Sequence, residues 1–132
     1  MDVCQQIVDA RQTGTVRCRI LAQPLASVDE TAAAFDLAPI AFLEVDEAAA
    51  RRIVQDVLGR DLAHDGSTMD SATAEDLTAR FFSYFASSSC RYFTNRGLDG
   101  RTWVPATAAT FDAGVIILAP HQVGCIWVED ED

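Results

Sequence analysis

The sequence predicts a single α+β domain, residues 1–132, in which a mainly antiparallel β-sheet carries two main helices on one face. Three observations lead to this fold class. With 132 residues, of which 49% are hydrophobic and 23% are charged, the chain has the length and composition of one globular domain. Two segments in the middle of the chain place apolar residues at helical spacing. From residue 90 onward the apolar period changes to two, which is typical of a C-terminal meander of strands.

The N-terminal part of the chain predicts two short helical segments and two strands. Residues 1–12 carry apolar side chains at loosely helical spacing and are expected to form a helix. Residues 15–21 alternate between polar and apolar side chains, which predicts a half-buried strand. Ser27 or Asp29 can cap a helical turn. Residues 39–45 are then expected to form a second and more deeply buried strand.

The clearest helix of the chain is expected between residues 46 and 59. The side chain of Asp46 can cap its first turn, and Gly59 can end it in a left-handed conformation. Glu47 and Arg51 stand four residues apart and can pair on the helix surface. The apolar residues at helical spacing, which should face the core, are Ala50, Ile53, Val54, Val57 and Leu58.

Residues 60–70 are polar and contain a Gly-Ser-Thr sequence, so they are expected to form a loop. A second main helix should begin near Ser71 or Thr73, because Thr73 and Asp76 have the spacing of a capping box. Its buried ridge is expected to consist of Leu77, Phe81 and Phe85. Both main helices are therefore expected to pack on the same face of the sheet.

The last third of the chain has the pattern of strands joined by tight turns. We expect strands at residues 90–95 and 102–105, separated by a turn that contains two glycines. Residues 111–118 and 122–128 should form a hairpin. The final four residues, 129–132, are all acidic and are expected to fray into solvent as a tail.

The charge balance excludes some classes of partner and favours another. The chain has 20 acidic and 10 basic residues, all ten of them arginine, and a formal net charge of −10. This charge repels phosphate backbones and anionic lipid headgroups, so neither nucleic acid nor membrane is an expected partner. It favours rapid and salt-sensitive association with a basic protein.

The sequence indicates a cytoplasmic protein that needs no cofactor. An acidic N-terminus without a long apolar run differs from a signal peptide, and the longest strongly apolar stretch, residues 114–120, is too short to cross a membrane. The four cysteines, at positions 4, 18, 90 and 125, are widely spaced and are expected to stay reduced. A chain of this length can build a sufficient core without a metal or disulfides, so neither is expected.

Patterns typical of catalysis or metal binding are weak. His64 stands beside Asp65 in a loop whose small polar residues are common turn chemistry. His121 and Cys125 would lie about 13 Å apart on one strand face, too far for one zinc ion. Glycine-rich phosphate loops, the nucleophile elbow of hydrolases and the zinc-protease motif are absent from the sequence. The sequence therefore favours binding over catalysis.

The most unusual segment, residues 91–103, combines arginines and aromatic residues in an otherwise acidic chain. The candidate partner-binding residues there are Arg91, Tyr92, Arg96, Arg101 and Trp103. Guanidinium and aromatic groups on such a rim can bind a carboxylate or the acidic loop of a partner. Alternatively, the arginines pair with carboxylates of this same protein while the aromatic side chains fill its core.

The acidic C-terminus is the second candidate surface for a partner. Its residues, which together would form a dense negative patch, are Glu129, Asp130, Glu131 and Asp132. Such a patch can steer a basic partner toward the protein. The alternative is that a frayed acidic end serves only solubility.

The leading functional hypothesis is therefore a small acidic protein-binding module. In its most concrete form, it is an inhibitor or immunity-type protein that masks the basic surface of a partner such as a bacterial toxin. The alternative is a small-molecule-binding or enzymatic domain, with an arginine-lined anion pocket between the aromatic helix and the sheet. A third possibility is a subunit that dimerises through the proline-containing strand at residues 102–105.

Overall fold

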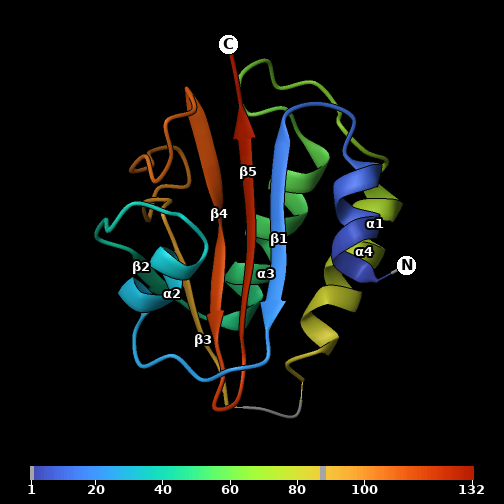
Figure 1. Ribbon diagram of the computed structural model, residues 1–132. Helices are drawn as coiled ribbons and strands as arrows, with labels where there is room; N and C mark the ends of the chain where they lie inside the picture. Colours follow the sequence, from blue (N-terminus) through green and yellow to red (C-terminus); the bar gives the residue numbers. More distant parts are fainter. Residues whose placement is uncertain (1, 87–88) are drawn as a thin grey trace.

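The computed structural model describes residues 2–86 and 89–132, and it confirms the predicted α+β class (Figure 1). None of the helices in these two ranges is long and apolar enough to cross a membrane. The elements in chain order are α1 (Val3–Ala10), β1 (Thr15–Leu21), α2 (Val28–Ala34), β2 (Leu43–Val45), α3 (Glu47–Gly59), α4 (Ser71–Ser83), β3 (Arg91–Thr94), β4 (Phe111–Leu118) and β5 (Val123–Asp130).

The five strands form one antiparallel sheet in the order β1-β5-β4-β3-β2. Strands β3, β4 and β5 are neighbours in both sequence and space, as a meander requires. The N-terminal strand β1 pairs with β5 along its whole length, and Cys18 lies opposite Ile126. The short strand β2 forms the other edge, so the two long strands β4 and β5 lie in the middle of the sheet.

Both faces of the sheet are covered, which gives the domain two apolar cores. Helices α1, α3 and α4 lie on one face, and the short helix α2 lies on the other (Figure 1). Successive side chains of a strand point to opposite faces, so Ile126 joins the core under α3 and α4 while Trp127 joins the core under α2. The two predicted main helices do share one face. Coverage of the opposite face by α2 was not predicted.

Each of the four helices in the described ranges begins at a side chain that accepts a hydrogen bond from the first turn, and the cap of α1 is Asp2. Ser27 caps α2 and Asp46 caps α3, as predicted. The cap of α4 is Asp70, whose carboxylate accepts from the Thr73 amide, so the predicted capping box at Thr73 is wrong. The predicted left-handed end at Gly59 is also wrong, because α3 continues through that residue and the chain leaves it in an extended conformation.

Two predicted strands are shorter or absent. The strand expected at residues 39–45 comprises only Leu43–Val45, and it is a half-buried edge strand rather than a deeply buried one. The preceding residues turn back on themselves, because the Ile40 amide donates to the carbonyl of Ala38. Residues 102–105 form only an isolated bridge between Arg96 and Trp103, where the loop closes.

The predicted frayed tail is wrong for its first two residues. Strand β5 extends through Asp130 because β1 supplies hydrogen-bonding partners as far as Glu129, and β4 supplies them for Asp130. Both carboxylates are paired, Glu129 with Arg17 at 2.6 Å and Asp130 with Arg11 at 2.8 Å. The ordered sheet therefore continues closer to the C-terminus than the charge pattern indicated.

Two strand glycines are required by close packing rather than by turns. A Cβ at Gly114 would overlap the carbonyl of Ile126 and the ring of Trp127. A Cβ at Gly124 would lie 2.6 Å from the ring of Phe85. Because both strands lie at the centre of the sheet, these contacts set how closely α4 and the strands approach one another.

Candidate functional site: an arginine and aromatic pocket

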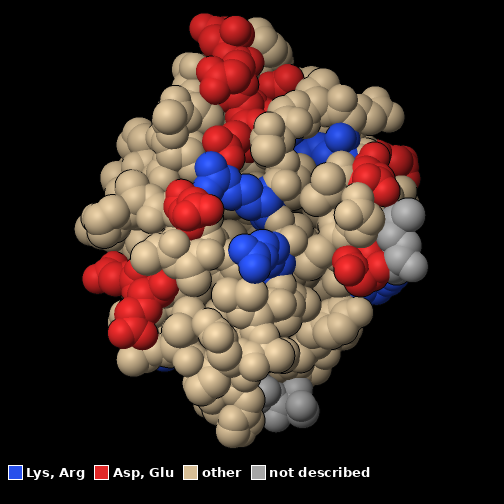
Figure 2. Space-filling model, viewed as in Figure 1, with Lys and Arg blue, Asp and Glu red and all other residues tan. Residues whose placement is uncertain are grey.

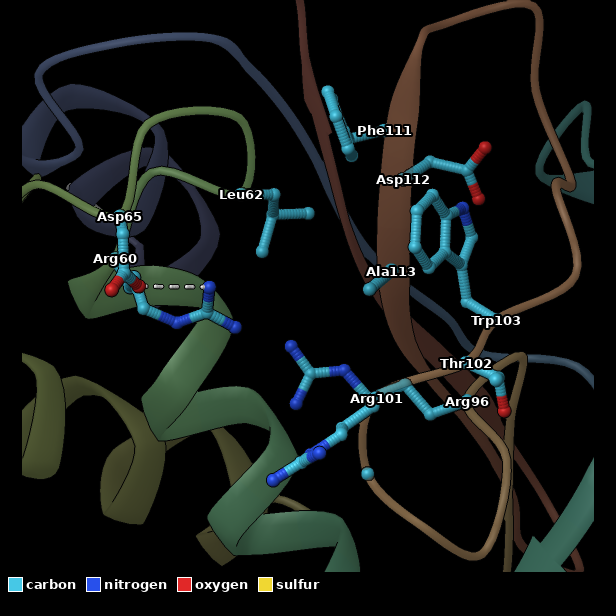
Figure 3. A pocket seen from close by; sticks show the side chains of 11 residues that line it. Arg60, Leu62, Asp65, Arg96, Arg101, Thr102, Trp103, Phe111, Asp112 and Ala113 are labelled. Carbon is cyan, nitrogen blue, oxygen red and sulfur yellow. Dashed lines mark hydrogen bonds and ion pairs between the residues drawn. The ribbon is translucent and has the colours of Figure 1, made fainter.

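A pocket of about 500 Å³ opens between the end of α3, the loop that follows it, the loop after β3 and the start of β4 (Figure 3). We call it the arginine pocket. The lining side chains that its chemistry depends on are Arg60, Arg96, Arg101, Leu62, Trp103 and Phe111. They come from two parts of the chain, residues 60–62 and 96–111, and the fold brings these two parts together.

The loop between residues 95 and 103 is held closed by its own hydrogen bonds. The amide of Gly97 donates to the carbonyl of Thr102 at 2.8 Å. The carboxylate of Asp99 accepts from the amides of Thr102 and Arg101 and from the Thr102 hydroxyl, and these bonds lower its pKa. Gly100 has a φ of +70°, which glycine adopts without strain. The turn therefore presents the side chain of Arg101 on a fixed backbone.

The guanidinium groups of Arg60 and Arg96 share one carboxylate, that of Asp56. One Nη atom of each guanidinium lies 2.8 Å from Asp56 Oδ2. The hydrogen bond from Arg60 is the main reason that the pKa of Asp56 is lowered, and it raises the pKa of Arg60. Arg60 also contacts the exposed carboxylate of Asp65 at 3.2 Å. Both guanidinium groups are thus held in place, with donor atoms still available to a ligand.

Arg101 differs from these two arginines because its guanidinium has no hydrogen bond or ion pair with any of the described residues. It is exposed and lines the same pocket. In a protein of net charge −10, an unpaired guanidinium beside two others is a local positive site.

The wall on the β4 side is anchored by the buried carboxylate of Asp112. Its Oδ1 atom accepts hydrogen bonds from Asn95 Nδ2 at 3.0 Å and from Trp127 Nε1 at 3.1 Å. Its Oδ2 atom accepts from the amide and hydroxyl of Thr107, and the Ala106 amide bonds to both oxygens. This carboxylate therefore fixes the segment that follows Trp103 against the sheet, and its acceptor capacity is already used.

Trp103 and Phe111 form the apolar wall. Their ring centroids are 5.5 Å apart and the planes are tilted by 34°. The side chain of Trp103 remains 38% exposed, which is much for so large an apolar group. A flat ring of a ligand can stack on this indole while charged groups of the same ligand meet the arginines.

Of the predicted binding residues in segment 91–103, Arg96, Arg101 and Trp103 come together in the pocket, and Arg91 and Tyr92 do not. Arg91 pairs with Glu44 on the neighbouring strand at 2.8 Å, as the alternative interpretation of the arginines stated. Tyr92 is only 8% exposed, and burial raises its pKa. Tyr92 therefore does not lie on an exposed rim, because a residue of β3 that faces the helices belongs to the core.

The four residues of the predicted acidic patch are not all exposed. Glu129 and Asp130 are paired within the sheet, whereas Glu131 accepts a hydrogen bond from the Thr110 hydroxyl at 2.6 Å, and Asp132 is exposed. Of the expected patch, the exposed charges are those of residues 131 and 132.

The expected place of an anion pocket, between the aromatic helix and the sheet, is filled by side chains. The rings of Phe81 and Phe85 approach Gly124 of β5 and pack in the core. Sequence reasoning missed Arg60, Leu62 and Phe111. The only signal for Arg60 was its place at the end of a well-predicted helix, where α3 points it toward the loop after β3.

Compared with known proteins, the chain matches no family model, no curated protein and no solved structure.

Proposed function

We propose that this domain is a binding module whose arginine pocket takes a small anionic ligand with a flat apolar part. The observation that supports the proposal most is the guanidinium of Arg101, which is unpaired among the described residues and lines the same pocket as the exposed indole of Trp103. An arginine without a carboxylate partner, in a concave site of this size, is typical of anion binding.

The groups of the pocket match carboxylate and phosphate chemistry. A guanidinium donates two parallel hydrogen bonds to such an anion, which a lysine cannot do. Arg60 stands at the end of α3, and Arg96 and Arg101 stand on the loop after β3, so a ligand with several oxygens can contact more than one of the three arginines. The tilted Trp103 and Phe111 rings provide the surface for the flat part of the ligand.

The carboxylate of Asp56 competes with an anionic ligand for the guanidinium groups of Arg60 and Arg96. It already neutralises part of the charge of Arg60 and Arg96, which limits how strongly they attract an anion. The proposal therefore gives Arg101 the largest part in ligand affinity. It is a proposal for binding rather than catalysis, because Asp112, the buried carboxylate of the pocket, has its acceptor capacity used by the protein.

Calorimetric titration with simple probes tests the proposal. We expect phenyl phosphate to bind more tightly than inorganic phosphate or benzoate, and neutral benzamide to give no measurable heat. Replacing Arg101→Ala should weaken phenyl phosphate binding roughly tenfold or more, the usual effect of removing a charge-assisted hydrogen bond.

The matched control is Arg80→Ala, which removes one positive charge from α4, where Arg80 contacts Asp76 and lies outside the arginine pocket. Its affinity for phenyl phosphate should equal that of the wild type within a factor of two. Equal binding by the Arg101→Ala variant and the wild type, or no binding of any anion, would contradict the proposal.

A second candidate, the docking of a basic protein such as a bacterial toxin, is favoured by the outward display of negative charge. Ion pairs among the described residues involve seven of the 20 carboxylates, which leaves 13 without a cationic partner there. Figure 2 shows acidic side chains gathered at the end where the chain terminates, with arginines in the middle of the same face.

The two candidates differ in their response to salt and to substitution. A basic partner captured from a native lysate should be released by added salt, and its capture should be weakened by Glu131→Gln with Asp132→Asn. Phenyl phosphate binding should not change in that double variant. Capture that neither salt nor the double variant weakens would remove the docking function.

A further inference from the structure

Two cysteines that are distant in the sequence lie side by side in the fold. Cys4 stands in the first turn of α1, and Cys18 stands in the middle of β1, against which α1 packs. The Sγ atoms are 2.8 Å apart, and the thiol of Cys18 donates a hydrogen bond to that of Cys4. Both are free thiols. The wide spacing of the cysteines in the sequence did not indicate that Cys4 and Cys18 lie next to each other.

We infer that Cys4 and Cys18 form a dithiol site that small-molecule disulfides convert into an intramolecular disulfide bond. A pair of this kind needs one accessible thiol that attacks and one neighbour that resolves the mixed disulfide. The two residues divide these roles by their burial, because Cys4 is half-buried and Cys18 is buried.

The surroundings of the pair support the same division. A hollow of about 360 Å³ opens onto both residues and gives a small disulfide access to Cys4; its other lining residues include Asp2, Arg19 and Tyr84. The hydrogen bond from Cys18 lowers the pKa of Cys4, whereas that bond and burial raise the pKa of Cys18. The thiolate that attacks is therefore that of Cys4.

The reaction is a two-step thiol–disulfide exchange. The Cys4 thiolate attacks one sulfur of the small disulfide, so that a mixed disulfide forms on Cys4 and one small thiolate leaves. The Cys18 thiol then loses its proton to that thiolate and attacks Cys4 Sγ, which releases the second small thiolate; this thiolate takes up from solvent a proton equivalent to the one that Cys4 lost when it ionised. Two protein thiols are oxidised to one disulfide, and the small disulfide is reduced to two thiols.

The other two cysteines provide internal controls. Cys125 is completely buried on the opposite face of the sheet, and burial raises its pKa. Cys90 lies just before β3, where its thiol donates to the carbonyl of Phe85 and where burial also raises its pKa. Neither shares the hollow of Cys4.

Incubation of the full chain with glutathione disulfide tests the inference by intact mass and peptide mapping. We expect the loss of two hydrogen atoms and a crosslinked peptide joining Cys4 to Cys18, both reversed by dithiothreitol. The bond ties α1 to β1, so the midpoint of thermal unfolding should rise by roughly 5–10 °C.

Single substitutions separate the two roles. Cys18→Ser should stop at a glutathione adduct on Cys4, Cys4→Ser should give no adduct on Cys18, and Cys90→Ser should behave as the wild type. The inference is overturned by a wild type that stays unmodified or stops at a glutathione adduct, or by a crosslink that involves Cys90 or Cys125. The result for the wild type alone decides the inference, so the test does not depend on whether the variants fold.

Discussion

Arg11 and Asp130 form a two-point ion pair in the interior, 119 residues apart in the sequence. Each Nη atom of Arg11 lies 2.8 Å from one carboxylate oxygen, and the two side chains are 0% and 2% exposed. Arg11 also donates to the carbonyls of Val57, Thr13 and Arg60. The pair therefore joins the ends of α1, α3 and β5, next to the backbone that carries Arg60 of the arginine pocket.

The first prediction is that Asp130→Asn destabilises the protein by about 3–5 kcal/mol, because it leaves the buried guanidinium of Arg11 without its counter-charge. Urea unfolding at neutral pH measures this loss. Glu131→Gln is the control, since residue 131 is exposed, and it should change the free energy of unfolding by less than about 0.5 kcal/mol. A similar small loss in both variants would show that the pair does not hold these elements together.

The second prediction concerns the close contact between β5 and Phe85, which follows the end of α4. Gly124→Ala places a methyl group against the Phe85 ring in a packed core and should cost about 1–3 kcal/mol of unfolding free energy. Gly66→Ala is the matched control, because a Cβ there meets none of the described atoms within 4 Å. Thermal unfolding of both variants gives the comparison, and an unchanged midpoint for Gly124→Ala would argue against the packing described.

The third prediction is a stabilising substitution on α4. The buried hydroxyl of Thr78 has no hydrogen-bond partner among the described residues. Thr78→Val keeps the shape, removes that unsatisfied group and should raise the free energy of unfolding by about 1 kcal/mol. Thr31→Val should have the opposite effect, because the Thr31 hydroxyl donates to the Ser27 carbonyl at 2.9 Å. If Thr78→Val were as destabilising as Thr31→Val, the Thr78 hydroxyl would have to have a hydrogen-bond partner.

The fourth prediction uses the carboxylate that Arg60 and Arg96 share. The hydrogen bond from Arg60 depresses the pKa of Asp56 below its ordinary value of 3.8. A depressed pKa means that this ion pair stabilises the fold above pH 3.8 and that the contribution is lost as the pH falls through the lower folded value. Asp56→Asn should therefore lower stability at neutral pH, and its stability should fall less steeply with acid than that of the wild type.

The same variant has a second measurable effect on the pocket. Asp56→Asn removes the negative charge next to Arg60 and Arg96, so the affinity for phenyl phosphate should increase. Calorimetry on both proteins measures the change. A decrease in affinity would show that the carboxylate positions the arginines more than it competes with the ligand.

Local signals in the sequence were sufficient for most helices and for the central strands. Asp46 precedes an apolar stripe at helical spacing, and the alternation in residues 111–118 and 122–128 predicts the hairpin, because caps and periodicity act within a few residues. The covering of the second sheet face by α2 depends on contacts between distant segments, which no local pattern reports.

The site was predicted only where its residues stand close together in the sequence. The clustering of Arg96, Arg101 and Trp103 was visible as a composition bias, whereas Arg60 joins them through the path of α3. The acidic tail was misjudged for the same reason. A run of four carboxylates predicts fraying, but Arg11 and Arg17 compensate two of them from elements at the opposite end of the chain.

The central claim is that the arginine pocket binds an anion with a flat apolar part. The chain has two tryptophans, and the indole N–H signal of each one can be followed separately to test it. The indole of Trp103 lines the arginine pocket, and that of Trp127 is buried and donates to Asp112. In a ¹H–¹⁵N NMR titration with phenyl phosphate, the indole signal of Trp103 should shift in a saturable way while that of Trp127 stays in place. The shift should be lost in Arg101→Ala and kept in Arg80→Ala. A Trp103 signal that phenyl phosphate leaves unmoved would contradict the account.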